Sequence, residues 1–240
     1  MNGPLLEIRG ISKRFGGLQA LEDLSFDVSK GEIVGLIGPN GAGKSTLFNT
    51  LVGLHKPTAG AVRLEGKDVT GLRPHRIAKR GMTKTFQNVA LFAETSVLDN
   101  VLIGALLRES VADARATART CLERVGLADV AEKAASDLSF PERARVEVAR
   151  GLATRPKVLL LDEVMAALNR VEMEEIMVLI RSLREDGLTV IVVEHHMHAI
   201  MSLCERIVVL NFGRKIAEGS PQEISRNQEV VRAYLGREYA

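Results

Sequence analysis

Gly38-Pro39-Asn40-Gly41-Ala42-Gly43-Lys44-Ser45 decides the fold, because this stretch has the G-x-x-x-x-G-K-[ST] spacing of a phosphate-binding loop. The apolar run 32–37 before it predicts a buried strand, and residues 45–54 behind it predict a helix. Such glycines let backbone N–H groups converge on one point, and the following helix directs its positive end at the same point. The alternative is an ordinary glycine turn, but the complete motif between these flanks favours a polyphosphate site.

The side chains of this loop predict how a nucleotide is held. Lys44 is expected to reach the β- and γ-phosphates, and the Ser45 hydroxyl is expected to ligate Mg²⁺. The rest of the predicted nucleotide cradle is Gly38, Pro39, Asn40, Gly41, Ala42, Gly43 and Thr46.

Length, charge and cysteine usage narrow the class of protein. The 240 residues are enough for one core with an inserted subdomain. The 32 basic and 30 acidic residues are interspersed and leave a net charge of +2, so charge gives no reason to expect nucleic acid as a partner. The sequence has neither a membrane-spanning apolar run nor a signal-peptide pattern, so we expect the chain to stay in the cytoplasm. Cys121 and Cys204 lie far apart and outside any metal-binding spacing, which predicts reduced structural thiols.

Periodicity predicts an α/β protein with a helical insertion. Residues 5–9 alternate like an edge strand, and a second alternating segment, 20–29, is expected to pair with it. Strand signals then stop between about 95 and 150, where three segments have helical periodicity: 97–107, 111–125 and 142–154. Strand-helix alternation resumes near residue 158.

The predicted fold class is therefore a P-loop nucleotide-binding α/β core with a mostly parallel sheet, an N-terminal antiparallel β subdomain and an inserted helical subdomain. Residues 1–240 are expected to form one domain. Within it, residues 1–87 and 155–240 would form the α/β core with the β subdomain, and residues 88–154 the helical subdomain.

A second candidate site element is the pair of carboxylates that ends the apolar run Val158–Leu161. A continuous apolar run is typical of a strand buried on both faces, and parallel sheets bind ligands beyond the carboxyl ends of their strands. Asp162 is expected to hold Mg²⁺, directly or through water, and Glu163 to polarise the attacking water near the γ-phosphate. The alternative for Glu163 is that it caps the following helix.

Several further phrases occur in one order along the chain: Arg14-Phe15-Gly16-Gly17-Leu18, Thr85-Phe86-Gln87-Asn88, Met165-Ala166-Ala167-Leu168-Asn169 and Val193-Glu194-His195-His196-Met197. With these phrases and the loop, the chain resembles the ATP-binding subunits of ATP-binding cassette (ABC) transporters, and among them those of branched-chain amino acid importers. The resemblance covers essentially the whole chain. It implies ATP and Mg²⁺ as cofactors and ATP hydrolysis as the activity.

The resemblance implies roles for positions that match the family's motifs. Phe15 matches the aromatic residue that stacks on adenine; the alternative is a core phenylalanine. Gln87 matches the glutamine that touches Mg²⁺ and the attacking water; the alternative is a polar strand end. His195 matches the histidine that contacts the γ-phosphate. Ser139 opens a helix that faces the ATP of a partner subunit, and Asn169 matches a loop that reports across the dimer.

A metal site is a weaker interpretation of the histidines His195, His196 and His198. Their spacing puts at most two of them on one helical face, and no acid or cysteine ligand is obvious nearby.

Leu138-Ser139-Phe140-Pro141-Glu142 departs from the family signature Leu-Ser-Gly-Gly-Gln. Pro141 stands where a glycine is expected; proline suits a helix start but has no N–H to donate. One backbone contact to the partner's γ-phosphate is therefore predicted to be missing. The loop after Glu163 departs as well, with Val164, Ala167 and Arg170 in place of proline, glycine and proline. These departures predict slow hydrolysis by a homodimer and favour a heterodimer.

The implied function is that of the ATP-hydrolysing subunit of an importer, coupling dimer closure to transport of branched-chain or other hydrophobic amino acids. Expected partners are transmembrane permease subunits, a second ABC ATPase subunit and, indirectly, a substrate-binding protein, with the chain peripheral on the inner face of the cell membrane. One alternative is a non-transporter ABC ATPase acting on nucleic acid or the ribosome, which usually has paired cassettes, coiled coils or basic extensions. Another is a small-molecule kinase, which would need an acceptor pocket and lid arginines.

Overall fold

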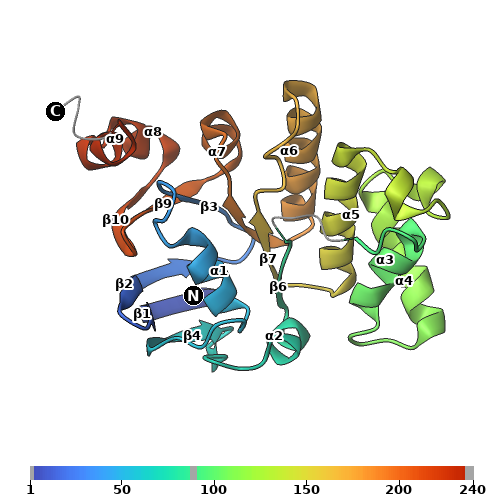
Figure 1. Ribbon diagram of the computed structural model, residues 1–240, viewed down its shortest axis with the longest axis horizontal. Helices are drawn as coiled ribbons and strands as arrows, with labels where there is room; N and C mark the ends of the chain where they lie inside the picture. Colours follow the sequence, from blue (N-terminus) through green and yellow to red (C-terminus); the bar gives the residue numbers. More distant parts are fainter. Residues whose placement is uncertain (1–2, 87–90, 236–240) are drawn as a thin grey trace.

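The computed structural model describes residues 3–86 and 91–235, which form two β-sheets with helices packed around them (Figure 1). The larger sheet has six strands in the order β10-β9-β3-β8-β7-β6. All neighbouring pairs in it are parallel except β10 with β9. The strands are β3 Ile33–Ile37, β6 Met82–Lys84, β7 Val158–Asp162, β8 Thr189–Val193, β9 Arg206–Asn211 and β10 Arg214–Gly219. Every residue of β3, β7 and β8 is buried, as a parallel sheet covered on both faces requires.

The smaller sheet is antiparallel and has the order β2-β1-β4-β5. Its strands are β1 Leu6–Phe15, β2 Leu18–Val28, β4 Ala59–Leu64 and β5 Lys67–Asp68. The expectation that residues 5–9 form an edge strand is wrong, because β1 pairs with β2 on one side and with β4 on the other. Alternating burial indicates which face of a strand is covered and carries no information about its edges.

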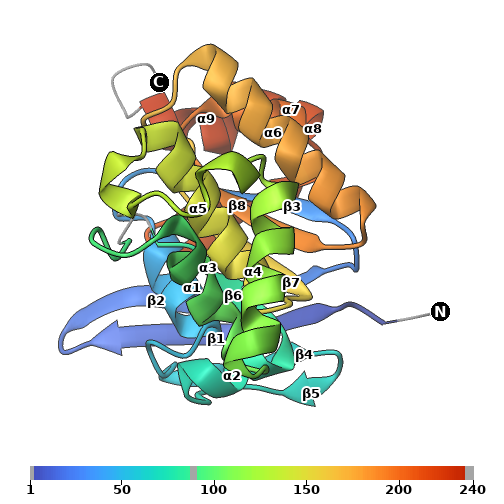
Figure 2. The same cartoon turned by 90° about the vertical axis from the view of Figure 1, so that its right-hand side faces the viewer.

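Three helices lie together at one end of the molecule, beyond β6 and β7 (Figures 1 and 2). They are α3 Val97–Ala105, α4 Val111–Arg124 and α5 Phe140–Ala153. The remaining helices are α1 Lys44–Leu51, α2 Pro74–Arg80, α6 Arg170–Glu185, α7 Met197–Leu203, α8 Pro221–Arg226 and α9 Gln228–Leu235. The α/β fold class is confirmed, whereas the division at residues 88 and 154 stays a prediction.

The helix behind the phosphate-binding loop is enclosed between the two sheets. Phe48 of α1 belongs to an apolar cluster that also contains β1 and β2 side chains and, from β3, Val34 and Leu36. Ile33 and Ile37 of the same strand belong to a second cluster, which contains side chains of α3 to α7. Successive side chains of β3 therefore pack into two different apolar clusters, so the strand that leads into the loop is held on both of its faces.

Both cysteines are buried and unpaired, as the sequence predicts. Burial raises the pKa of the Cys121 thiol to about 11 and that of Cys204 to about 12. Both thiols are therefore protonated and unreactive near neutral pH.

A glycine sets the distance between α3 and α5. A Cβ atom placed on Gly104 would lie 2.3 Å from the carbonyl oxygen of Arg150 and 3.1 Å from Cβ of Ala153. Because the obstruction is backbone, it cannot be relieved by a rotamer change. The two helices pack in this register only without a side chain at position 104.

We expect Gly104→Ala to force α3 away from α5. Overpacking of this kind costs about 1–3 kcal/mol, and the better helix propensity of alanine offsets about 1 kcal/mol of that. The midpoint of thermal unfolding should therefore fall by several degrees, as measured by differential scanning calorimetry. Gly17→Ala is the matched control, because a Cβ atom there meets nothing within 4 Å. Equal midpoints for the two variants would contradict this explanation of the α3–α5 contact.

Candidate functional site

One hollow of about 680 Å³ lies at the carboxyl ends of the central strands. It is lined by residues 40–46 of the loop, by Leu18, Gln19 and Ala20 of β2, and by Glu163, His195 and Phe212. The loop follows β3, Glu163 follows β7, His195 follows β8 and Phe212 follows β9. Since these strands are parallel neighbours, segments far apart in the sequence arrive at the same edge of the sheet.

The loop backbone has the close approaches for which its glycines are needed. A Cβ atom on Gly38 would lie 2.2 Å from the carbonyl oxygen of Leu210. Gly43 has a φ of 104°, and a Cβ atom there would lie 2.8 Å from the carbonyl oxygen of Ala20. Gly43 is also the residue before α1, so no side-chain group caps the first N–H groups of this helix. Those N–H groups are thus left for an anion in the hollow.

Lys44 is folded back over the loop. Its side chain is buried, and Nζ donates hydrogen bonds to the carbonyl oxygens of Gly38 at 2.6 Å and Pro39 at 3.2 Å. Burial lowers the pKa of this ammonium, and the charges of Glu163 and Asp162 oppose that shift. The cation is therefore held at the centre of the hollow with two carboxylates close by.

Asp162 has a carboxylate oxygen suited to a cation. The residue is 2% exposed, and its Oδ2 lies 3.4 Å from Nζ of Lys84. Its Oδ1 is buried without a hydrogen-bond partner in the part of the chain that the structure describes. Burial raises the pKa of Asp162, and the charge of Lys84 opposes this. A buried carboxylate oxygen without a partner is unfavourable unless a ligand binds it, so this oxygen fits a hard cation such as Mg²⁺.

Glu163 faces the hollow from a strained backbone. Its φ is 54°, and its N–H donates to the carbonyl oxygen of Val193 at 2.9 Å. Its Oε1 lies 2.8 Å from Nε2 of His195. The helix-capping alternative does not hold, because α6 is capped by Asn169, whose side chain accepts bonds from the N–H groups of Val171 and Glu172. A strained residue aimed into a polar hollow is typical of a functional position.

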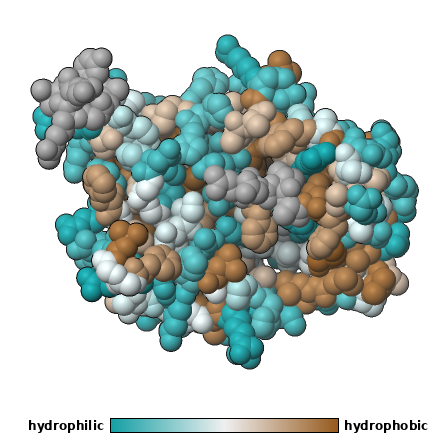
Figure 3. Space-filling model, in the orientation of Figure 1, coloured by the Kyte–Doolittle hydropathy of each residue, from teal (hydrophilic) through white to brown (hydrophobic). Residues whose placement is uncertain are grey.

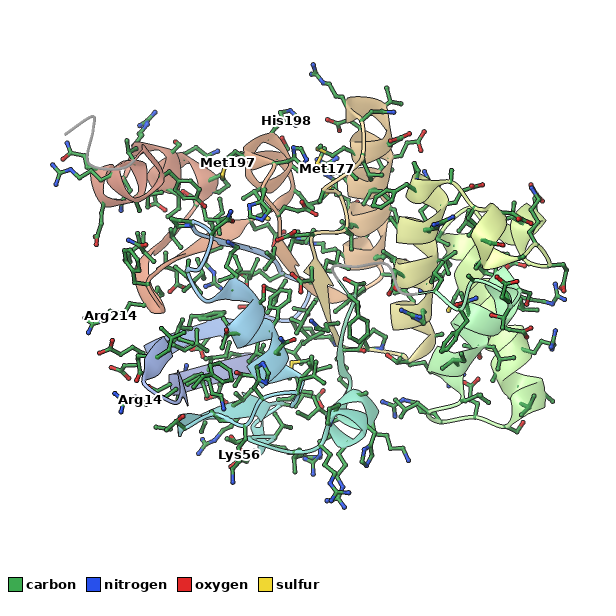
Figure 4. All side chains as sticks on the ribbon, in the orientation of Figure 1. Arg14, Lys56, Met177, Met197, His198 and Arg214 are labelled. Carbon is green, nitrogen blue, oxygen red and sulfur yellow. The ribbon has the colours of Figure 1, made fainter. Side chains whose placement is uncertain are left out.

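The other histidines do not converge on this pair. His198 is exposed on the outer side of α7 (Figure 4), and its Nδ1 lies 3.9 Å from Oε1 of Glu174. His195 instead faces Glu163. The arrangement favours an acid–imidazole pair over a histidine metal site.

A buried acid behind the pair has no role in the sequence-based prediction. Oε1 of Glu194 accepts a hydrogen bond from the N–H of Met165 at 2.7 Å, which ties the loop after Glu163 to the end of β8. The pKa of Glu194 is raised to about 7, chiefly by burial and also by the charges of Glu163 and Asp162, against the opposing effect of hydrogen bonds from the N–H groups of Met165 and His195. The signal in the sequence was a third carboxylate at the end of a buried apolar strand.

Among the predicted site residues that the structure describes, five do not line the hollow: Gly38, Pro39, Asp162, Phe15 and Ser139. Phe15 ends β1, where its ring meets the His55 ring edge-on at 5.1 Å and lies 4.7 Å from Nζ of Lys13. Ser139 is exposed at the start of α5, where its N–H and hydroxyl both donate to Oε2 of Glu142, at 2.8 and 2.6 Å. Gln87 lies outside the described residues.

Four lining residues escaped the sequence-based prediction: Leu18, Gln19, Ala20 and Phe212. Their approach to the loop follows from the position of β2 and from the pairing of β9 with β3, which no local pattern encodes. For Phe212, the only local signal is an aromatic residue before a glycine at the end of an apolar run.

The described residues include no helix that is both long and apolar enough to cross a membrane.

Comparison with known proteins gives concordant matches over almost the whole chain. A family model described as ABC transporter matches residues 21–166, and one described as branched-chain amino acid ATP-binding cassette transporter matches residues 214–240. The chain is 40% identical to the high-affinity branched-chain amino acid transport ATP-binding protein BraF of Pseudomonas aeruginosa, over 98% of this chain and 99% of that protein. It is 41% identical to the corresponding protein LivG of Escherichia coli, with the same coverage.

Solved structures also match most of the chain. A nucleotide-free ATP-binding cassette from an ABC transporter superposes with a TM-score of 0.91 at 30% identity, covering 98% of this chain and all of that one. A dimeric cassette in a post-hydrolysis state, bound to ADP and Pi, superposes with a TM-score of 0.81 at 30% identity, covering 90% of this chain and 98% of that one.

We expect Glu194→Gln to change how stability depends on pH. The pKa of this acid is about 7 in the folded chain, against an ordinary value of 4.5. Protonation therefore favours the fold, and the wild type loses this stability as the pH rises from about 4.5 to about 7. The variant has no such loss, so the variant-minus-wild-type difference in Tm should be more positive at about pH 8 than at about pH 5.

Differential scanning calorimetry at both pH values measures this difference. Glu185→Gln, which removes an exposed carboxylate of α6, is the control for a general charge effect. A Glu194→Gln difference that stays constant between the two pH values would show that Glu194 is already ionised in the fold.

Proposed function

The chain belongs to the ABC transporter family of ATP-binding proteins, and within it to the proteins of branched-chain amino acid transport, so we propose that it binds and hydrolyses Mg-ATP in the hollow. Hydrolysis would drive the import of branched-chain or other hydrophobic amino acids. The single observation that carries the hydrolytic role is that Lys44 and the Glu163–His195 pair line the same hollow. A cation for the phosphates and a base for the water are then close together.

The loop residues would hold the triphosphate. Residues 40–46 line the hollow, and the uncapped N–H groups at the start of α1 would bind an anion there. Lys44 would exchange its two carbonyl partners for phosphate oxygens. Ser45 and Asp162 are the proposed Mg²⁺ ligands, because the first lines the hollow and the second has an orphaned oxygen; Gln87 is proposed on resemblance alone. Bound Mg²⁺ would neutralise charge that develops on the β- and γ-oxygens.

Glu163 is proposed to orient the attacking water and accept its proton. Nε2 of His195 lies 2.8 Å from Oε1 of Glu163, and in the tautomer with the proton on Nε2 it would donate to that carboxylate and fix its direction. The N–H of Glu163 also donates to the carbonyl oxygen of Val193, which holds the backbone of this residue beside the end of β8. Phe15 is kept as a proposed adenine contact, on resemblance alone.

Ser139 is proposed to act on a second subunit. It lies at the start of α5, outside the hollow of its own chain, so it can reach a nucleotide only in another cassette. The dimeric relative bound to ADP and Pi supports such an assembly. Pro141 is the second residue of α5 and supplies no N–H to that nucleotide. We therefore favour a partner cassette with a complete signature over a second copy of this chain.

The helical end carries apolar side chains that suit a membrane partner. Phe86, Phe92, Ile103 and Leu106 are each more than two-fifths exposed. Figure 3 shows hydrophobic surface over the region of α3 and α4. We propose that permease subunits dock on this surface and hold the chain at the cytoplasmic face of the membrane. A substrate-binding protein would act through those subunits. Residues 88–154 would then transmit the motion as a helical subdomain.

Glu163→Gln should keep nucleotide binding and lose turnover, because the amide cannot accept the proton of the water. Loss of a general base lowers the rate by about 10²–10⁴-fold. The ATP-bound dimer should therefore accumulate with Mg-ATP and be seen by size-exclusion chromatography coupled to light scattering. The double variant with Lys44→Ala should remain monomeric, because it lacks the phosphate contact. Full ATPase activity of Glu163→Gln would contradict the role of this carboxylate.

Pro141→Gly should raise the ATPase rate of the homodimer, because it returns an N–H to the start of α5. Single donors of this kind change rates by about 10²–10³-fold, so an increase of about tenfold or more is expected. Pro141→Ala also returns the N–H and should act in the same direction. Pro221→Ala, at the corresponding end of α8, is the control and should leave the rate unchanged. Unchanged rates for both Pro141 variants would show that this N–H is irrelevant.

A further inference from the structure

Phe212 has an exposure and a backbone conformation that the fold alone does not explain. It is 84% exposed, more than any other large hydrophobic residue of the described chain, and its φ is 45°. A left-handed conformation is unfavourable for a bulky residue, and glycine or asparagine normally takes such a turn position. A strained, exposed phenylalanine at the wall of a ligand hollow is a candidate for a functional contact.

The turn that holds Phe212 is fixed to both walls of the hollow. The N–H of Gly213 donates to the carbonyl oxygen of Ala42 in the loop at 3.0 Å, and its carbonyl oxygen accepts from the N–H of Glu22 in β2 at 2.9 Å. Arg214, at the outer edge of β10 (Figure 4), pairs with the Glu22 carboxylate at 2.5 Å. The ring is therefore presented from an anchored hairpin, which limits the entropy lost when it contacts a ligand.

Strand order puts Phe212 on the side of the loop away from the catalytic pair. β3 lies between β9, which ends one residue before Phe212, and β8, which leads to His195. Glu163 follows β7, the next strand beyond β8. A nucleotide whose terminal phosphate lies at Glu163 and His195 must cross the loop in the opposite direction. Its nucleoside is then directed toward Leu18, Ala20 and Phe212.

Phe15 does not line this side of the hollow. Its ring lies 4.7 Å from the Lys13 ammonium, meets His55 edge-on, and is not among the lining residues of the hollow. Phe212 is the only phenylalanine or tyrosine that lines the hollow in residues 3–86 and 91–235. An aromatic ring contributes to binding by stacking on a purine or packing against ribose.

We propose that Phe212 is a nucleoside-contacting residue, whose ring packs against the base or ribose of the nucleotide bound at the loop. This inference rests on the proposed function, since it requires a nucleotide in the hollow. Because this contact requires a base or ribose, Phe212 in the turn between β9 and β10 would make the site bind nucleotides more tightly than simple polyphosphates. Truncation of an aromatic ring that stacks on a base weakens binding by about 5- to 100-fold, so roughly tenfold is expected here.

The test compares two ligands, Mg-ADP and Mg-pyrophosphate, by isothermal titration calorimetry. Both use the loop, but only ADP has a nucleoside, and neither supplies the γ-phosphate needed for dimer closure. Phe212→Asn removes the ring while suiting the left-handed turn, and Phe212→Tyr keeps the ring. We expect Phe212→Asn to weaken ADP binding about tenfold and to leave pyrophosphate binding unchanged, and Phe212→Tyr to retain wild-type ADP affinity.

Three outcomes would overturn the proposal. ADP affinity unchanged in Phe212→Asn would show that the ring does not touch the nucleoside, and a simultaneous weakening of the Glu163→Gln dimer would then assign Phe212 to the subunit interface. Equal loss of ADP and pyrophosphate affinity would show that the turn only shapes the loop. A wild-type chain that binds neither ligand would overturn the proposed function itself, which separates that failure from the failure of this inference.

Discussion

Parallel pairing of β3 with β8 on one side and β9 on the other is the constraint on which the site depends. It fixes the loop between His195 and Phe212, and the next strand, β7, adds Asp162 and Glu163. The pairing is stable because β3 contributes to an apolar cluster on each of its faces. Any change that moved β3 relative to its neighbours would separate the phosphate cradle from the carboxylates.

Charge in the hollow is arranged around the place a phosphate would take. Lys84 pairs with Asp162, and the charges of Asp162 and Glu163 act both on Lys44 and on the buried Glu194. Burial raises the pKa of Asp162 and Glu194 and lowers that of Lys44, so each shift favours the neutral form. The charged forms are therefore incompletely compensated by the chain itself, and Mg²⁺ with a polyphosphate would supply further counter-charges.

The local parts of the fold and site could be predicted from the sequence. The strand, loop and helix around residues 38–45 were predictable because their pattern and glycine spacing are contiguous. The position of Glu163 at the ligand-binding edge of the sheet followed from the apolar strand that it ends, whereas the role of His195 was implied only by the resemblance. The inner position of β1 and the approach of Phe212 were not predictable, because both depend on which distant strands pair. The left-handed backbone of Glu163 was also hidden, since a non-glycine residue gives no signal for it.

The closed start of α5 has a consequence for assembly. Hydrogen bonds from Ser139 to Glu142 lower the pKa of that carboxylate, so an anion of the same chain already occupies the donors that a neighbour's phosphate would need. The carboxylate of Glu142 would thus occupy the place proposed for the partner's phosphate. If a second cassette docks as proposed, its phosphate would replace this carboxylate with little change in the number of hydrogen bonds. In the proposed dimer, such an exchange would keep the two cassettes from binding too tightly and would let them separate once the phosphate has left.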